Sequence, residues 1–121
     1  MGEPIRQAKG IKCVIDHHLD PEGFEDYAYW DPSAAATAQL IYRFLSDEMQ
    51  DPDHISADMA TCLYTGIMTD TGSFRFRSTT SEIHRIIATL IDCGARNWAI
   101  HEEIYNSSSE SRLKFLGFCL L

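Results

Sequence analysis

The segment that most constrains the fold is a short apolar run, "IKCVI" at residues 11–15. Its apolar residues are largely β-branched and continuous, which is the pattern of a strand buried on both faces of a parallel sheet. The run ends at Asp16, and a proline and a glycine shortly afterwards indicate a loop. Because such a strand needs neighbouring strands and covering helices, the sequence predicts an α/β fold.

Helical patterns dominate the rest of the chain, with one further short strand expected at "YAYW", residues 27–30. Asp31-Pro32 is typical of a helix start, because aspartate caps a helix and proline suits its first turn. Thr79 and Glu82 have the spacing of a capping box. Apolar spacing predicts helices after Asp31-Pro32, Ser56 and Thr79, a break over residues 50–54, and two more helices over residues 97–106 and 109–121.

The composition excludes several classes of protein. An apolar fraction of 45% is enough for a core, and no apolar run is long enough to cross a membrane. The net charge of −8, from 18 acidic and 10 basic residues, argues against binding long double-stranded nucleic acid through a basic face. No signal peptide is visible, and the four cysteines, which lack Cys-x-x-Cys spacing, are interpreted as reduced core thiols. We therefore expect a cytoplasmic protein.

The two ends of the sequence indicate a part of a larger fold. The predicted strand follows a short polar leader, and the last helix stops at Leu120-Leu121 without a polar turn. Because one strand cannot form a sheet, we expect further strands upstream and a further segment downstream. The alternative is a small helical domain with one edge strand. Exposed strand edges and an apolar terminal helix favour self-association, so we expect a homo-oligomer.

Asp16, His17 and His18 directly follow the predicted strand, where open α/β sheets bind their ligands. Histidine is a common transition-metal ligand, and carboxylates suit hard divalent ions. Neighbouring side chains of an extended chain point to opposite sides, so one histidine can bind a metal while the other reaches a substrate. Asp16 can orient an imidazole ring by accepting its N–H. A chance cluster of surface residues is the alternative.

A second polar cluster lies in "GIMTDTGSFRF", residues 66–76, where a predicted helix ends. Asp70 has threonines on both sides, with Gly72 and Ser73 close behind. Most carboxylates in such a position cap the helix or lie in a solvated turn, and glycine with hydroxyl residues favours a tight turn. On this local evidence Asp70 is either a turn residue or a ligand.

Arg75 and Arg77 flank Phe76 directly after this cluster. In an extended chain their side chains share one face, and the planar guanidinium fork suits a phosphate group. The alternative is a solvated edge strand with Phe74 and Phe76 packed inward. We take Arg75 as a candidate substrate-binding residue and interpret Arg77 as solvated.

Together these stretches resemble the DHH phosphoesterase superfamily. "VIDHH" is similar to the third motif of that family. "GIMTDTGSFRF" is similar to its fourth motif, in the form found in the branch of nanoRNases and phosphoadenosine-phosphate phosphatases. "YWDPSAAATAQLIYRFL" and "STTSEIHRIIATLIDCGA" resemble helices of the same branch, so the resemblance covers nearly the whole chain.

The resemblance implies an α/β enzyme that hydrolyses phosphate esters with two divalent ions, usually Mn²⁺, with Mg²⁺ as an alternative. His17 matches a metal ligand, and Asp70 matches a second ligand of the same ion. His18 matches the histidine that contacts the substrate phosphate, and Asp16 matches a residue that supports the site. These two are therefore the candidate catalytic residues. The implied substrates are short oligoribonucleotides and phosphoadenosine phosphate, without involvement of a membrane.

Other features of the family are absent from these 121 residues. The first two motifs would precede Met1, and the substrate-binding domain would follow Leu121. The resemblance thus implies that residues 1–121 are the C-terminal part of a DHH catalytic domain, a partial parallel sheet that is mostly helical here, with the start of a helical connector. Because two ligands leave a hard cation mostly to water, we expect little hydrolase activity from this chain alone.

Two further interpretations stay open. Within the superfamily, the intact protein is alternatively a cyclic-dinucleotide phosphodiesterase or a polyphosphate-type hydrolase. Outside it, the chain is a non-catalytic helical interaction or regulatory module that keeps both motifs as remnants. The regulatory interpretation predicts that His17→Ala and Asp70→Asn leave the function of the full protein unchanged.

Overall fold

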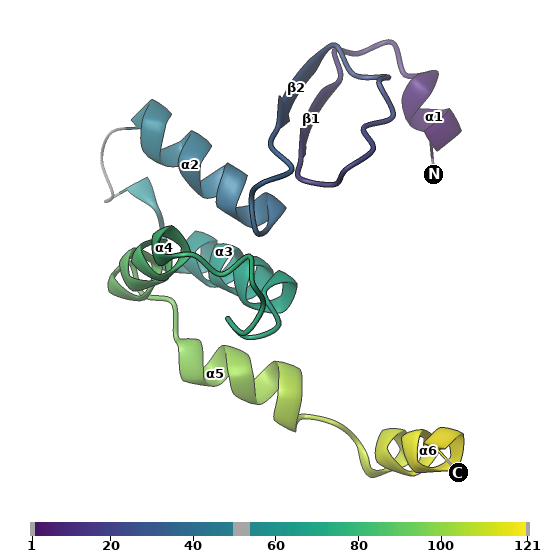
Figure 1. Cartoon of the computed structure of the whole chain (residues 1–121), viewed down its shortest axis with the longest axis vertical. Helices are drawn as coiled ribbons and strands as arrows, with labels where there is room; N and C mark the ends of the chain where they lie inside the picture. The colour runs from purple at the N-terminus through teal and green to yellow at the C-terminus, as the bar shows by residue number, and fades with distance from the viewer. Residues whose placement is uncertain (1, 50–53, 121) are drawn as a thin grey trace.

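The computed structural model describes residues 2–49 and 54–120, so the predicted helix break over residues 50–54 lies almost wholly outside it. The chain runs from a strand pair through a group of packed helices to a separate helix at the C-terminus (Figure 1). The elements are α1 (Gly2–Arg6), β1 (Cys13–Asp16), β2 (Tyr27–Trp30), α2 (Thr37–Met49), α3 (Ala57–Asp70), α4 (Ser81–Asp92), α5 (Asn97–His101), the π-helix η2 (Glu102–Asn106) and α6 (Glu110–Leu120). This is the mostly helical α/β fold that the sequence predicts.

The strands β1 and β2 form a two-stranded parallel sheet. Cys13 pairs with Tyr27 and Asp16 pairs with Trp30, so the two strands end together. Residues 17–26 join them without a helix, although parallel neighbours usually need a longer crossover. Within the described residues β1 packs mainly against β2 and α2 and is half-buried, so the predicted burial on both faces does not occur here.

The hydrophobic core lies between α2, α3 and α4. Leu40 from α2, Ile67 from α3 and Leu90 from α4 are fully buried, which confirms the apolar stripes predicted from helical spacing. Burying side chains of this size stabilises the fold by about 1.5–3 kcal/mol each. The helices α2 and α3 approach each other closely at Gly66. A Cβ atom added there would lie only 2.9 Å from the Cβ atom of Ala38.

The helix α2 begins later than the Asp31-Pro32 signal predicts, at Thr37. The Asp31 carboxylate accepts hydrogen bonds from the backbone N–H and the hydroxyl of Ser33, at 2.9 and 2.6 Å. Aspartate therefore closes a local turn here instead of capping a helix. This turn carries the chain from the end of β2 to the start of α2.

The N-cap of α4 is Thr80 and not Thr79. The Thr80 hydroxyl accepts a hydrogen bond from the Ile83 N–H at 3.4 Å. Glu82 does not complete a capping box, because its carboxylate accepts two hydrogen bonds from Arg43 of α2, both at 2.8 Å. The helix was predicted correctly, whereas the capping box was wrong because a contact between helices uses its carboxylate.

Several apolar side chains lie on the surface. The helix α6 buries none of its side chains. Exposed large apolar side chains on the other helices include Phe44 of α2, Ile91 of α4 and Trp98 of α5. No disulfide joins cysteines among the described residues, and Cys13, Cys62 and Cys119 are exposed, so the core position predicted for these three was wrong. None of the described helices combines the length and the apolar character that a membrane span requires.

Candidate metal and phosphate site

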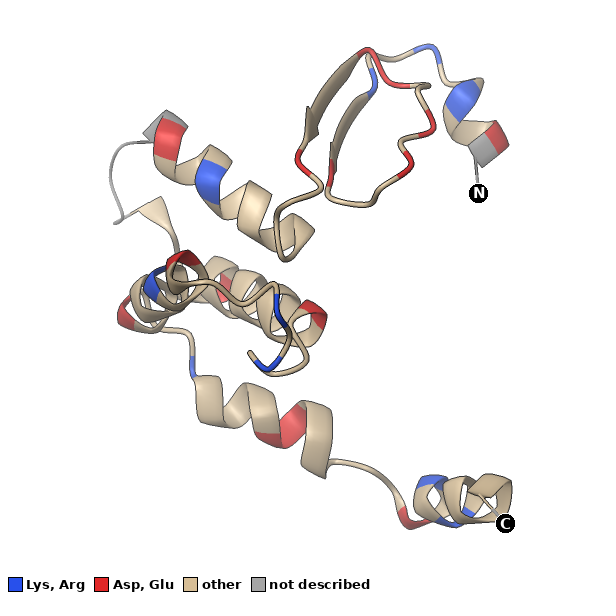
Figure 2. Cartoon of the chain, in the orientation of Figure 1, with Lys and Arg blue, Asp and Glu red and all other residues tan. Residues whose placement is uncertain are grey.

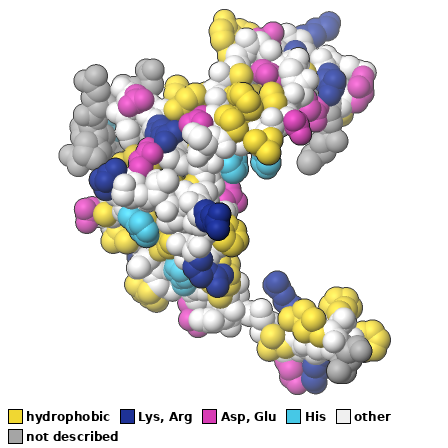
Figure 3. All heavy atoms as spheres, in the orientation of Figure 1, with side chains coloured by type: hydrophobic (Ala, Val, Ile, Leu, Met, Phe, Trp, Pro, Cys, Tyr) yellow, Lys and Arg dark blue, Asp and Glu magenta, His cyan; other side chains and the backbone are white. Residues whose placement is uncertain are grey.

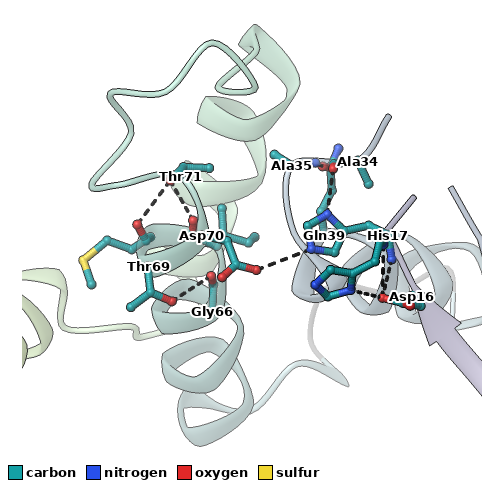
Figure 4. Close-up of polar contacts among 12 residues, drawn as sticks. Asp16, His17, Ala34, Ala35, Gln39, Gly66, Thr69, Asp70 and Thr71 are labelled. Atoms are coloured by element: carbon teal, nitrogen blue, oxygen red, sulfur yellow. Dashed lines mark hydrogen bonds and ion pairs between the residues drawn. The ribbon is translucent and has the colours of Figure 1, made fainter. Parts of the chain in front are cut away.

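The structure brings His17 and Asp70 together from separate parts of the chain (Figure 4). His17 directly follows β1, and Asp70 is the last residue of α3. The Nε2 atom of His17 lies 3.8 Å from Oδ2 of Asp70. The two motifs therefore converge, as the sequence predicts, where the carboxyl end of the strand meets the carboxyl end of the helix.

A backbone contact determines which nitrogen of His17 faces Asp70. The Nδ1 atom lies 3.1 Å from the carbonyl oxygen of Ala34, which can only accept, so we assign the ring hydrogen to Nδ1. The Nε2 atom then presents its lone pair toward the carboxylate. Two acceptors that face each other need a proton or a cation between them.

The pair fits a single divalent ion. Ligand bonds of about 2.0–2.2 Å from each atom reach a common ion over a span of up to about 4 Å. The 3.8 Å separation lies within that span, and imidazole nitrogens and carboxylate oxygens both bind divalent metal ions. Among residues 2–49 and 54–120, no group of three or more His, Cys, Asp or Glu side chains is arranged to hold a metal. In the described chain the candidate ligands are therefore His17 and Asp70.

Asp16 orients His18 from the end of β1. Its Oδ1 atom accepts hydrogen bonds from Nδ1–H of His18 at 2.6 Å and from the His17 backbone N–H at 2.8 Å. The hydrogen bond from the His18 side chain is the largest cause that lowers the pKa of the Asp16 carboxyl. From the end of β2, Trp30 donates its indole N–H to the His18 carbonyl at 2.7 Å. The His18 side chain is 77% exposed, which leaves Nε2 available to a ligand.

Sequence reasoning missed the residues that support His17. Ala34 lies in a run of alanines that was interpreted as helix, yet its carbonyl orients the imidazole ring. The buried side chain of Gln39 accepts a hydrogen bond from the Ala35 N–H at 2.7 Å, which fastens this turn beside His17 (Figure 4). The available signal was a glutamine among apolar residues, because a buried amide needs a partner.

Arg75 lies between α3 and α4 in a series of turns, not in the extended chain considered from the sequence. Ser73 and Phe74 have φ angles of 57° and 64°, which no strand contains. The Nε–H of Arg75 donates to the carbonyl of Gly72 at 2.7 Å, and the side chain is otherwise exposed. No hydrogen bond or ion pair joins Arg75 to His18 in the part of the chain that the structure describes.

Charges are unevenly distributed around the hollow between the strand pair and α6. Acidic residues follow the loop between β1 and β2, and basic residues occur on the segment between α3 and α4 (Figure 2). Histidine, acidic and basic side chains lie along the inner wall of this hollow (Figure 3). The acidic loop residues are Asp20, Glu22, Glu25 and Asp26. A phosphate is repelled by this loop and attracted toward Arg75 and Arg77.

A family model described as the N-terminal domain of the DHH family matches residues 2–67. The chain belongs to the DHH family. The DHH match includes the Asp16-His17-His18 sequence and ends before Asp70. The family resemblance inferred from the motifs is therefore confirmed, and with it a relationship to phosphoesterases.

Several DHH proteins are similar to most of this chain. The bifunctional oligoribonuclease and PAP phosphatase NrnA of Thermus thermophilus is 40% identical over 79% of this chain and 28% of its own length. NrnA of Bacillus subtilis is 28% identical over 93% of this chain and 36% of its own. The crystal structure of an exopolyphosphatase-related protein from Bacteroides fragilis matches with a TM-score of 0.87 and 39% identity, over 98% of this chain and 34% of that one. This chain thus spans between 28% and 36% of these relatives.

Proposed function

We propose that this chain is part of a metal-dependent DHH phosphoesterase that hydrolyses short oligoribonucleotides, removes the 3′-phosphate of phosphoadenosine phosphate, or does both. The names of the T. thermophilus and B. subtilis relatives support these substrates. One observation carries the proposal: His17 Nε2 and Asp70 Oδ2 face each other at 3.8 Å as two acceptors, with the imidazole oriented by Ala34. A divalent cation satisfies both.

Each residue of the proposed site has a role that follows from its contacts. His17 and Asp70 hold one divalent ion, Mn²⁺ or Mg²⁺. Such an ion acidifies a bound water and neutralises the charge that develops on the phosphoryl oxygens. His18, whose ring Asp16 orients, presents Nε2 to a phosphate oxygen. Arg75, on the basic side of the hollow, binds the same phosphate through its terminal guanidinium nitrogens.

We further propose that residues 1–121 form the C-terminal part of a DHH catalytic domain and the start of a helical connector. The two-residue ligand set supports this, because a hard divalent ion usually has six or more ligands. The share of the B. fragilis chain that is matched, 34%, is consistent with it. The remaining ligands and the substrate-binding domain then lie outside these residues.

The metal pair is tested by titrating Mn²⁺ into the purified chain and following the free ion by electron paramagnetic resonance. We expect weak, saturable binding that Asp70→Asn weakens by more than about tenfold, the effect typical of disturbing a metal site. Asp58→Asn, in the first turn of the same helix, is the matched control and should bind Mn²⁺ like the wild type. Equal affinities of Asp70→Asn and wild type for Mn²⁺ would contradict the proposal that Asp70 and His17 hold one metal ion. Sub-micromolar binding with phosphatase turnover would contradict an incomplete ligand set.

The substrate class is tested by assaying the full-length protein against dinucleotides, phosphoadenosine phosphate, cyclic di-AMP and polyphosphate. We expect hydrolysis of the first two. Preference for cyclic di-AMP or polyphosphate would favour another activity of the superfamily, and the name of the B. fragilis protein supports polyphosphate as second candidate. Unchanged function after His17→Ala and Asp70→Asn would instead support a regulatory module.

A further inference from the structure

The last turn of α3, which carries Asp70, is closed by the residues that follow it. The Ser73 N–H donates to the Met68 carbonyl at 2.8 Å, and the Gly72 N–H donates to the Thr69 carbonyl at 3.1 Å. These two bonds form a Schellman motif, in which the left-handed residue after the cap is glycine. The direction of the Asp70 carboxylate therefore depends on where the Ser73 backbone lies.

Two residues of this segment adopt a conformation that L-amino acids rarely adopt. The φ angles of Ser73 and Phe74 are 57° and 64°, in the left-handed region that Cβ atoms disfavour. Packing holds Phe74, whose ring lies edge-on to Tyr64 at 5.8 Å and beside His84 at 6.1 Å. Ser73 has a small side chain that cannot be held in this way. Its backbone is held by the hydrogen bonds of its own N–H and of the Phe74 N–H, which donates to the Thr71 hydroxyl at 3.2 Å, and its hydroxyl makes one further contact.

That contact comes from the π-helix η2. The Ser73 hydroxyl donates a hydrogen bond to the hydroxyl oxygen of Tyr105 at 2.9 Å. The Tyr105 ring packs beside His101 at 5.9 Å, and Nε2 of His101 lies 3.3 Å from the hydroxyl of buried Tyr64. A continuous series of contacts thus runs from the middle of α3 through α5 and η2 to the turn that closes α3.

The hydrogen bond adds to the apolar contacts that Ile100 of α5 and Ile104 of η2 make with the core. Beside these contacts an open pocket of about 410 Å³ lies between α3 and the segment formed by α5 and η2, and its lining includes Thr61, Thr65 and Glu103. Tyr105 itself is 48% exposed. Because this pocket leaves part of the boundary between α3 and η2 unfilled, the polar contact helps to hold the two segments relative to each other.

We propose that Tyr105 is a positioning residue for the candidate metal site. Its hydroxyl holds Ser73 in the left-handed conformation, the Ser73 N–H closes the last turn of α3, and this turn directs Asp70 toward His17. The part of this inference that concerns the metal rests on the proposed function. It assigns a role to the segment at residues 97–106, which lies outside both DHH motifs.

The positioning role is tested by amide hydrogen exchange in the 121-residue chain. Tyr105→Phe keeps the ring and removes the hydroxyl, so we expect exchange at residues 70–73 to rise about two- to tenfold, the effect of one lost neutral hydrogen bond. Tyr27→Phe, exposed on β2, is the matched control and should leave these amides unchanged. Circular dichroism checks that both variants keep the fold. Unchanged exchange in Tyr105→Phe overturns the proposal.

Variants of Ser73 separate the hydrogen bond from the backbone conformation. Ser73→Ala removes the other end of the same bond, so adding Tyr105→Phe should have no further effect, and additive effects overturn the proposal. Ser73→Gly also loses the hydroxyl, but glycine adopts a φ of 57° without strain. Exchange should therefore rise less in Ser73→Gly than in Ser73→Ala. Equal rises would overturn the claim that Tyr105 maintains a disfavoured conformation.

The affinity for Mn²⁺ distinguishes failure of this proposal from failure of the proposed function. Where the wild type binds Mn²⁺, Tyr105→Phe should weaken binding about two- to tenfold, although it does not touch the ion. An affinity equal to that of the wild type overturns the positioning role. Absence of Mn²⁺ binding in the wild type contradicts the proposed metal pair instead, and the exchange measurements still decide whether Tyr105 positions the turn.

Discussion

At residue 72 the backbone conformation requires glycine, and a neighbouring ring lies close by. The φ angle of Gly72 is 56°, and a Cβ atom there would lie 2.5 Å from the Cζ atom of Phe76. The side chain of Phe76 is 57% exposed, so its ring can move away from an added methyl group. The backbone cannot relax as easily, because the Schellman motif at the end of α3 needs the left-handed conformation at this residue.

We therefore predict that Gly72→Ala lowers the free energy of unfolding by about 1–2 kcal/mol, the cost of one left-handed alanine. Urea denaturation followed by circular dichroism measures it. The matched control is Gly117→Ala in α6, where an added Cβ meets no atom within 4 Å. The control should leave the unfolding of the core unchanged, since α6 buries none of its side chains. A Gly72→Ala variant as stable as the wild type would show that the turn relaxes without cost.

At the scale of elements, Arg43 joins α2 to α4 and to the turn before α2. Its guanidinium donates to both carboxylate oxygens of Glu82, each at 2.8 Å, and to Oδ2 of Asp31 at 3.0 Å. The hydrogen bond with Glu82 is the largest cause that raises the pKa of Arg43. The same contact is the largest cause that lowers the pKa of Glu82, whereas for Asp31 the largest is the hydroxyl of Ser33. These contacts make the packing of α2 depend on ionised carboxylates.

The lowered pKa values of Glu82 and Asp31 predict a loss of stability in acid. A carboxyl group whose pKa is lower in the folded chain stabilises the fold above its ordinary pKa, 4.5 for Glu82 and 3.8 for Asp31. That stabilisation disappears as the pH falls through the folded pKa. We expect the free energy of unfolding to decline as the pH falls below 4.5, the ordinary pKa of Glu82. Urea denaturation at successive pH values would measure this decline.

Arg43→Met separates this contribution from general acid effects. At neutral pH we expect Arg43→Met to lower the free energy of unfolding by about 1–2 kcal/mol, because it removes charged hydrogen bonds. The loss is no larger because those hydrogen bonds are partly exposed. In acid the variant should lose less further stability than the wild type. Arg112→Met, exposed on α6, is the control and should follow the wild-type curve. Parallel curves for Arg43→Met and wild type would mean that other carboxylates cause the acid sensitivity.

At the scale of the whole molecule, apolar surface is concentrated toward the two ends of the curved chain (Figures 1 and 3). Ile11 beside the strand pair is 77% exposed, and Phe115 and Phe118 of α6 are 68% and 80% exposed. The strands have no further partners among the described residues, so their outer edges present unpaired backbone groups. Surfaces of this kind favour association.

We therefore predict that the 121-residue chain self-associates in solution. Light scattering should give a mass above 13.7 kDa, and the excess should fall in a Phe115→Ser/Phe118→Ser double variant. A control with Arg112→Ser and Lys114→Ser changes the same helix without removing apolar area, and should associate like the wild type. A monodisperse monomer of the wild type would contradict the prediction.

Much of the secondary structure could be predicted from the sequence, because its signals are local. A continuous β-branched run predicts β1, and apolar residues at helical spacing predict α3 and α4. The histidines at the strand end were candidates because imidazoles there suit a metal, whereas Asp70 was selected through the resemblance of its motif to the DHH superfamily. Local signals failed where a side chain had a distant partner: Glu82 binds Arg43 instead of its own helix start.

Composition and local pattern thus determined the fold class, the helices and the residue types of the candidate site. Only the tertiary structure decided that His17 Nε2 and Asp70 Oδ2 lie 3.8 Å apart, that Ala34 orients the imidazole ring, and that Tyr105 reaches Ser73. The physical reason is that each of these contacts joins residues distant in sequence. Their positions follow from the combined packing of all the helices, which no pattern within one segment contains.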